Sequence, residues 1–154
     1  MKSNSVCASR RLQRVQISTP LLIPSFSSTE SENIRQIHED LSEYISRASL
    51  VSAYDIKNKF IDKKALSCSE VVFIDSGNYE KEYLAKVRSA EIDWSYNDYL
   101  EVINSLDSLN KFVIVNYDEV KSLSVQISNA NKLFSSHSDY ANCFLCKPKF
   151  NGKN

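Results

Sequence analysis

Short apolar runs alternate with amphipathic helical patterns along almost the whole of this chain, and this alternation restricts the fold more than any other feature. It is typical of a parallel sheet whose strands are joined by crossover helices. The clearest run covers residues 71–74, which are β-branched or aromatic and unbroken, as in a strand buried on both faces. The sequence therefore predicts an α/β fold with about five parallel strands, at residues 21–23, 48–54, 71–74, 112–117 and 143–146.

Three segments repeat their apolar residues at the spacing of a helix. Thr29 and Glu32 form a capping box before the first segment, and Ser95 is suited to cap the second. The segment between residues 56 and 69 is rich in lysine and irregular. The predicted helices cover residues 34–45, 96–109 and 120–134.

Charge and length exclude several classes of protein. The 154 residues carry 19 basic and 19 acidic side chains, so no net charge attracts nucleic acid or an anionic membrane. No run of about 18 apolar residues is present, so we expect no membrane-spanning segment. The length suits one domain with a core of its own.

The four cysteines are Cys7, Cys68, Cys143 and Cys146. They are not spaced like a secreted disulfide framework, and reduced thiols in a cytoplasmic protein are the simpler interpretation. Cys143 and Cys146 have the spacing of half a zinc site, but no second pair of ligands follows them. We expect them to lie in a buried strand and to bind no metal.

Three predicted strands end at an aspartate, namely Asp55, Asp75 and Asp118. In parallel α/β folds, functional groups gather on the loops after the carboxyl ends of the strands. Aspartate is also common there because it favours turns and helix caps. With three strand ends of the same kind, a structural role and a functional role are about equally favoured.

Asp75 is the strongest candidate because Ser76, Gly77 and Asn78 follow it. Gly77 is the only glycine in the interior of the chain, so it marks a turn that needs a positive φ. Such a turn can expose backbone N–H groups beside the carboxylate. Tyr79 could stack on a planar ligand and Glu80 could accept a second hydrogen bond, an arrangement that suits guanine-like bases.

Three motifs resemble those of the queuine/archaeosine tRNA-guanine transglycosylases. Residues 17–25 resemble the opening segment of that family, in which Thr-Pro is followed by apolar residues and a second proline. Residues 72–80 resemble its DSGGFQ signature, and residues 113–119 are similar to the strand that ends in FDE. The resemblance runs from about Ile17 to Pro148 and covers the first half of such an enzyme.

The resemblance implies the first part of a TIM-type (β/α) barrel that exchanges guanine in nucleic acid for a 7-deazaguanine. Asp75 would be the catalytic acid and base, and Asp118 would bind the incoming heterocycle. The other substrate-binding residues would be Ser76, Gly77, Asn78, Tyr79 and Glu119. Asp55 has no role that the resemblance assigns.

The chain departs from the family signature at three positions. Asn78, Tyr79 and Glu80 stand where the family has Gly, Phe and Gln, which is more similar to the branch of the family that modifies DNA. The nucleophilic aspartate and the Cys/His zinc site of the family belong to its second half. We therefore expect no cofactor in this chain and no catalysis by it alone. The expected partners are a nucleobase or deazaguanine, tRNA or DNA, and a second chain that completes the barrel.

The resemblance also divides the chain into three parts. We expect a flexible basic N-terminus over residues 1–16, the barrel half over 17–148 and a basic tail over 149–154. A half barrel has an unpaired sheet edge and an uncovered apolar face, so we expect poor solubility or self-association.

Two alternatives stay open. The first is a non-enzymatic module that binds a nucleobase or a partner protein. The second is a receiver-type signalling domain, in which Asp75 would accept phosphate and Lys147 would lie nearby. The receiver fold expects an acidic pair after the first strand and Ser or Thr after the fourth, and this chain has neither.

Three further residues are expected to have ordinary roles. His38 is expected to be solvated on its helix, His137 to lie in a serine-rich loop, and Trp94 to pack against the sheet.

Overall fold

The computed structural model describes residues 11–12, 17–18, 21–29, 33–41, 43–44, 47–63, 65–107, 111–119 and 121–146. Its strands are β1 (Arg11–Leu12), β2 (Ile17–Ser18), β3 (Ser25–Phe26), β4 (Ala48–Ser52), β5 (Val71–Asp75), β6 (Phe112–Val115) and β7 (Ala141–Cys143). Its helices are α1 (Ile34–Asp40), α2 (Ala53–Lys57), α3 (Asn78–Arg88), α4 (Tyr96–Asn104) and α5 (Leu123–Ser136), with a 3₁₀ turn, η1, at Ala65–Cys68.

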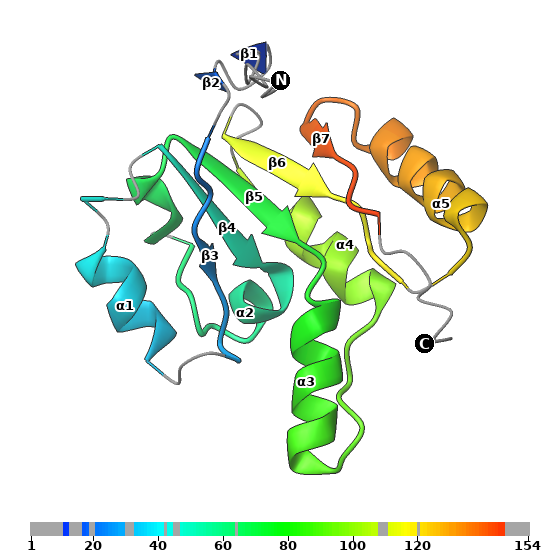
Figure 1. Cartoon of the computed structure of the whole chain (residues 1–154), viewed down its shortest axis with the longest axis horizontal. Helices are drawn as coiled ribbons and strands as arrows, with labels where there is room; N and C mark the ends of the chain where they lie inside the picture. Colours follow the sequence, from blue (N-terminus) through cyan, green and yellow to red (C-terminus); the bar gives the residue numbers. More distant parts are fainter. Residues whose placement is uncertain are drawn as a thin grey trace, which may run out of the picture.

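Strands β3 to β7 form one parallel sheet in which the order in space is the order along the chain (Figure 1). The longest ladder joins β4 to β5, from Ala48 opposite Val71 to Ser52 opposite Asp75. Each strand therefore lies beside the next one, and the intervening segments are crossover connections. The predicted α/β fold with five parallel strands is confirmed for the described residues.

The consecutive strand order excludes a receiver-type arrangement of this sheet. A doubly wound sheet of that kind has the order 2-1-3-4-5, since its chain returns to the first strand's other side. Here the chain always moves on in the same direction. Lys147, which the receiver alternative needed, lies outside the described residues.

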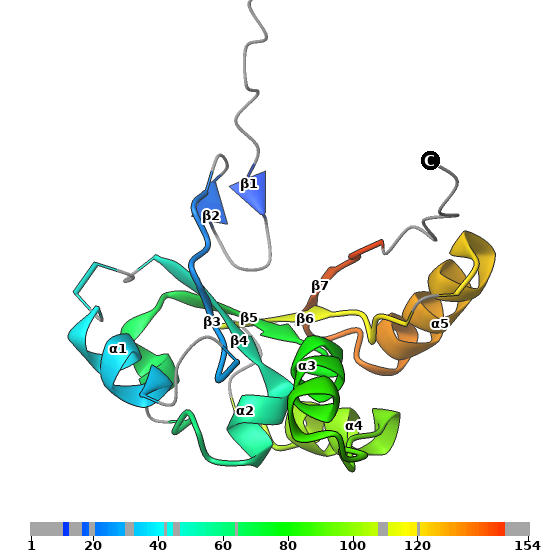
Figure 2. The same ribbon diagram turned by 60° about the horizontal axis from the view of Figure 1, so that its bottom comes forward.

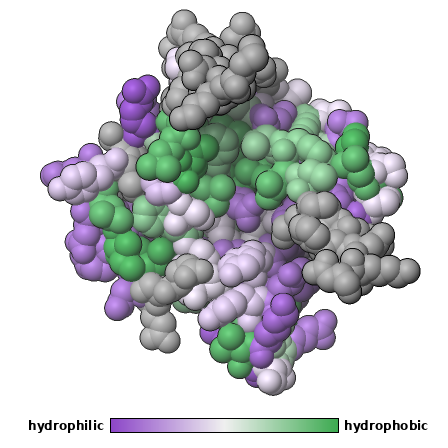
Figure 3. Space-filling view, in the orientation of Figure 1, coloured by the Kyte–Doolittle hydropathy of each residue, from purple (hydrophilic) through white to green (hydrophobic). Residues whose placement is uncertain are grey.

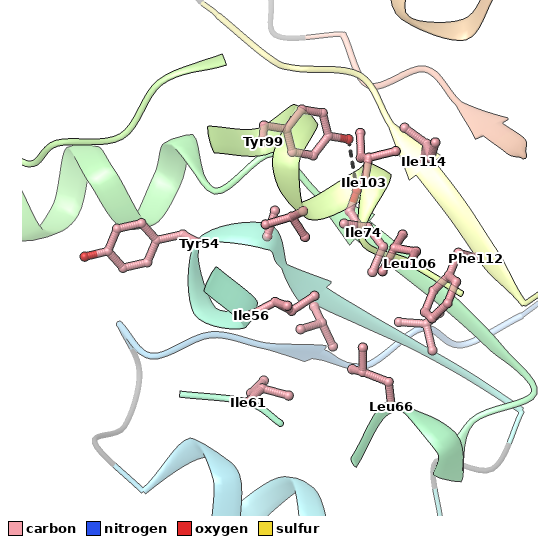
Figure 4. Close-up of a cluster of buried hydrophobic side chains, with 14 of the residues drawn as sticks. Tyr54, Ile56, Ile61, Leu66, Ile74, Tyr99, Ile103, Leu106, Phe112 and Ile114 are labelled. Carbon is pink, nitrogen blue, oxygen red and sulfur yellow. Dashed lines mark hydrogen bonds between the residues drawn. The ribbon is translucent and has the colours of Figure 1, made fainter. Parts of the chain in front are cut away.

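Helices α1, α2, α4 and α5 cover one face of the sheet, where the main core lies (Figure 2). Alternate residues of β5 and β6 point to this face, as the two-residue repeat of a strand requires. They meet apolar side chains of α1, α2, α4 and α5, and Figure 4 shows the central part of this contact. The strand residues of this core are Phe26, Val51, Val72, Ile74, Phe112 and Ile114.

The opposite face carries a second, smaller apolar cluster. Its buried members are strand residues, and Leu21 and Ile23 pack against it from the segment before β3. Figure 3 shows hydrophobic residues gathered in the upper half of the face seen in Figure 1, above more hydrophilic surroundings. The buried members are Ala48, Val71, Phe73, Val113 and Val115.

Helix α3 is the largest element that the sequence did not predict. Tyr79, Tyr83 and Val87 recur every four residues but are exposed, while its buried residues are Asn78 and Glu80. Its exposed residues mix these apolar side chains with charged ones such as Glu82 and Lys86, so α3 has no clear apolar stripe. Periodicity therefore could not reveal it.

The first two strands of the sheet differ from the prediction, and β6 ends at Val115 where the predicted strand ran to residue 117. The predicted strand at 48–54 ends at Ser52, because Ser52 caps α2 by accepting a hydrogen bond from the Tyr54 N–H at 3.2 Å. The first strand of the sheet is Ser25–Phe26 and not 21–23, which flanks the second apolar cluster.

The start of α1 also differs. Asn33 is its N-cap, and Thr29 bonds the Ser27 hydroxyl instead of capping. Glu32 lies outside the described residues. His38 is 1 % exposed, with its ring 4.7 Å from that of Phe26, and burial lowers its pKa. The prediction of a solvated His38 was wrong because α1 turns this polar residue toward the core.

The helices predicted at 96–109 and 120–134 are present, but α4 ends at Asn104 and α5 covers Leu123–Ser136. Ser95 caps α4 in a capping box with Asp98. His137 follows the end of α5 and is its C-cap, so it lies at a helix end where a serine-rich loop was predicted. Trp94 is buried, as predicted, with its ring 5.4 Å from that of Tyr54.

The last strand is shorter and more exposed than predicted. It ends at Cys143, and Phe144, Leu145 and Cys146 are exposed. The prediction that residues 143–146 form a buried strand was wrong, because no described element lies beyond β7 to cover them.

Residues 1–10 and 147–154 lie outside the described part of the chain, so the flexible start and the basic tail stay predictions. Strand β1 falls within the predicted flexible start and pairs with β2. Among the described helices, none combines the length and apolar composition needed to cross a bilayer.

Candidate functional site

The carboxyl ends of the parallel strands bring polar side chains together at one edge of the sheet. Asp75 is the last residue of β5, Asp55 lies in α2 directly after β4, and Asp118 follows β6. Glu80, in the first turn of α3, is the fourth acid. Asp55, Asp75, Glu80 and Asp118 are called the carboxylate cluster below.

Asp75 is the one member of the cluster that is partly exposed. Its carboxylate accepts hydrogen bonds from the backbone N–H groups of Ser76 and Gly77. Burial, followed by the negative charges of Asp118 and Glu80, nevertheless raises the pKa of Asp75 to about 6. A carboxyl group with such a pKa can both accept and donate a proton near neutral pH.

The turn after β5 has the backbone that the sequence predicted. Gly77 has a φ of +80° and is the N-cap of α3. A Cβ at Gly77 would lie 2.7 Å from the Cβ of Tyr54, so no larger residue fits. The N–H groups of this turn, however, face the carboxylate of Asp75 itself instead of standing open for a ligand.

Ser76, Asn78 and Asp118 form a buried network beside Asp75. The Ser76 hydroxyl donates to the Asp118 carboxylate, and the Asn78 side-chain amide donates to the Asp118 backbone carbonyl at 2.5 Å. Trp94 fixes the same turn through its indole N–H, which donates to the Ser76 carbonyl at 3.0 Å. Asp118 is 3 % exposed, so its carboxylate holds the loops after β5 and β6 together.

Glu80 is the least satisfied acid of the cluster. One of its oxygens accepts from the Ser27 hydroxyl at 2.5 Å, and among the described residues the other has no hydrogen-bond partner although it is buried. A buried carboxylate oxygen without a partner costs free energy, unless a ligand or an ordered water supplies a donor. Glu80 is thus the part of this edge most suited to receive an N–H group.

Asp55 has an evident structural role. Its two oxygens accept from the backbone N–H of Ser28 at 2.9 Å and from the Ser28 hydroxyl at 2.5 Å. Burial still raises the pKa of Asp55 to about 6, with Glu80 contributing. Together with the bond from Ser27 to Glu80, these contacts tie the loop after β3 to α2 and α3.

Two predicted substrate-binding residues lie apart from this network. Tyr79 is 50 % exposed and its ring pairs with that of Tyr83 at 6.3 Å. Glu119 forms an ion pair with Lys121 and lines a separate small cavity. Within the described part of the chain, no hydrogen bond or ring contact joins either residue to Asp75.

Tyr99 joins the carboxyl ends of two strands at this edge, a role that the sequence did not predict. Its hydroxyl donates to the backbone carbonyls of Val115 and of Ile74, the latter at 3.4 Å, so it links the ends of β6 and β5 (Figure 4). Burial raises the pKa of Tyr99 well above its usual value. Its apolar neighbours made it look like an ordinary core residue of α4.

The described residues contain no group of His, Cys, Asp and Glu arranged to hold a metal ion. The described cysteines Cys68, Cys143 and Cys146 are free thiols.

No family model, no curated protein and no solved structure matches this chain.

Proposed function

We propose that this chain is the base-binding half of a (β/α) barrel that exchanges guanine in nucleic acid for a 7-deazaguanine. The proposal is carried by two acids at the same sheet edge: Asp75, whose pKa is raised to about 6 by burial and in part by the charge of Glu80, and Glu80, which has an unpartnered buried oxygen. A purine of this kind presents a ring N–H and an exocyclic amine, which two carboxylates can accept.

The winding of the sheet supports a barrel. Five strands follow one another in space, and the main core and its helices lie on one face. A barrel begins in this way, with parallel strands inside and helices outside. In such a barrel, the second apolar cluster would form part of the interior.

In the proposed reaction, Asp75 exchanges the proton of the heterocycle. The departing guanine takes a proton from it, and the incoming base returns one when it attacks the sugar. The carboxylate that attacks the sugar C1′ would come from barrel strands beyond the five described, in the same protein or in a partner chain. The 154 residues would therefore bind the base without exchanging it.

Calorimetric titration with guanine and 7-deazaguanine tests the proposal. We expect saturable one-to-one binding, weakened at least about tenfold by Asp75→Asn, since one charge-assisted hydrogen bond contributes about 1.5–3 kcal/mol. Asp139→Asn is the matched control, because Asp139 is an exposed acid between α5 and β7. Equal binding of adenine, or equal binding by Asp75→Asn, would rule the proposal out.

A second candidate is a nucleobase-binding module without catalysis. The hydrogen bond that the Ser76 hydroxyl donates to the buried Asp118 carboxylate favours this second candidate, because a carboxylate engaged in this way has a structural role. In that case Asp118→Ala abolishes purine binding although circular dichroism shows a retained fold, while Asp75→Asn binds as tightly as the wild type.

A further inference from the structure

A small cavity lies between α4, α5 and the loop after β6. We name it the α4–α5 pocket, and its volume is about 250 Å³. Small-molecule sites usually measure about 300–1,000 Å³, so this one has room for the planar base of a nucleotide, with the sugar and phosphate at its mouth. Its lining residues are Tyr96, Tyr117, Glu119, Asn129 and Lys132.

Two tyrosines give the pocket an aromatic wall. The rings of Tyr96 and Tyr117 meet edge to face at 5.2 Å, and Tyr117 also contacts the buried ring of Tyr99 at 5.7 Å. A hydrogen bond with the Asn78 side chain fixes Tyr117 further. The wall is therefore in place before any ligand arrives, which lowers the entropy cost of stacking on it.

The opposite wall is polar and comes from α5. Asn129 and Lys132 are three residues apart, so they lie on the same side of the helix. Within the described part of the chain, no hydrogen bond or ion pair occupies the Asn129 amide or the Lys132 ammonium. Glu119 adds an acceptor, and Lys121 holds it in place.

We propose that the α4–α5 pocket binds one nucleotide, with its base against Tyr96 and Tyr117 and its phosphate on Lys132. Asn129 and Glu119 supply the donor and acceptor that a base edge needs. Aromatic rings stack on every base, so the tyrosine wall accepts any nucleotide, and only the polar wall could prefer one base over another.

The pocket shares a wall with the candidate site. Tyr117 faces the pocket on one side and bonds Asn78 on the other, and Asn78 in turn bonds the backbone of Asp118. The inference rests on the proposed function in one respect. If the carboxylate cluster takes a base of a polynucleotide, the α4–α5 pocket takes a nearby nucleotide of the same strand.

Binding of cytidine 5′-monophosphate, measured by calorimetry, is the first test, because a pyrimidine nucleotide lacks the guanine that the carboxylate cluster is proposed to take. Tyr96→Ala and Lys132→Ala are expected to weaken binding about tenfold each, and Tyr96→Phe is expected to restore it by keeping the ring. Tyr44→Ala and Lys86→Ala are the matched controls, since both side chains are exposed elsewhere. Binding that Tyr96→Ala and Lys132→Ala leave unchanged would overturn the proposal.

A labelled single strand of eight nucleotides identifies the source of the nucleotide. If the strand binds, Lys132→Ala should lower the slope of log K against log salt by about one. If only the free monophosphate binds, with the same losses in the variants, the pocket stands as a site for free nucleotides.

The two proposals fail separately. Failure of guanine to bind, with monophosphate binding still lost in Tyr96→Ala, would remove the proposed function and keep the pocket.

Discussion

Gly77 and Ser89 begin and end α3, and both have a positive φ, of +80° and +49°. Only glycine adopts this conformation without strain. At Gly77 the neighbouring Tyr54 also leaves no room for a Cβ. Replacing Gly77 by a larger residue should therefore destabilise the fold, and replacing Ser89 by glycine should stabilise it.

We expect Gly77→Ala to lower the free energy of unfolding by at least about 2 kcal/mol, from backbone strain and the close contact together. Ser89→Gly is expected to raise it by about 0.5–1 kcal/mol, because strain is removed and no contact is lost. Urea unfolding monitored by Trp94 fluorescence measures both. A neutral Gly77→Ala variant would contradict the described turn.

The raised pKa of Asp75 also predicts how stability depends on pH. Its pKa is 3.8 ordinarily and about 6 in the folded chain, so the folded state holds the proton more tightly. This contribution to stability is fully present below about pH 4 and is lost as the pH rises through about 6.

Asp75→Asn is therefore expected to be more stable than the wild type at pH 7, by about 1–3 kcal/mol, and equally stable at pH 4. Urea unfolding across this range, in the absence of ligand, measures the difference. A constant difference between Asp75→Asn and the wild type at all pH values would contradict the assignment.

At the scale of single elements, α4 and α5 can be compared directly, because both have a serine at the N-cap. Ser95 caps α4, and the Asp98 side chain completes the capping box. Ser122 stands at the same position of α5, where its side chain makes no capping hydrogen bond. Helix α4 matters for the site because it carries Tyr99 and Tyr96.

Ser95→Ala is expected to cost about 1 kcal/mol of stability, and Ser122→Ala less than about 0.5 kcal/mol. Thermal or urea unfolding distinguishes the two. Equal losses would mean that the capping box at Ser95 contributes nothing beyond the residue's intrinsic preference.

At the scale of the whole molecule, the sheet ends at strands that have one neighbour each. Within the described residues, β7 pairs with β6 alone, and Phe144 and Leu145 are exposed directly after it. Unpaired strand edges next to exposed apolar side chains promote association. This is where a further barrel strand would add.

We expect the 17.6 kDa chain to self-associate at tens of micromolar, as sedimentation velocity would measure. Phe144→Asp should shift the distribution toward the monomer, because it places a charge beside the open edge. Val87→Asp, on the exposed side of α3, is the control and should change little. A monomer at every concentration would contradict both the edge argument and the half-barrel proposal.

Much of the sheet could be predicted because each strand has a local signature. The run at residues 71–74 is apolar throughout, and β5 occupies that place with one further residue, Asp75. Ser95 and Gly77 are local in the same sense, since a cap and a positive φ depend on a few neighbouring residues. These features follow from covalent geometry and short-range hydrogen bonds.

The candidate site could be predicted only in part. Asp75 was found from its position at a strand end, but the engagement of Asp118 by Ser76 joins residues 42 apart in the chain. The unpartnered oxygen of Glu80 depends on α3, which has no amphipathic pattern, and on Ser27, 53 residues away. No local pattern encodes such pairs.

The sequence by itself determined the succession of the five parallel strands, the turn at Gly77 and the aspartate that ends β5, because these follow from local sterics and periodicity. Only the tertiary structure decided which polar groups are buried and hydrogen-bonded and which are accessible to a ligand. His38 and Asp118 became buried, and Tyr96 and Lys132 came to face one pocket. The reason is that burial and charge depend on which strands become neighbours, and that order exists only once the whole sheet has formed.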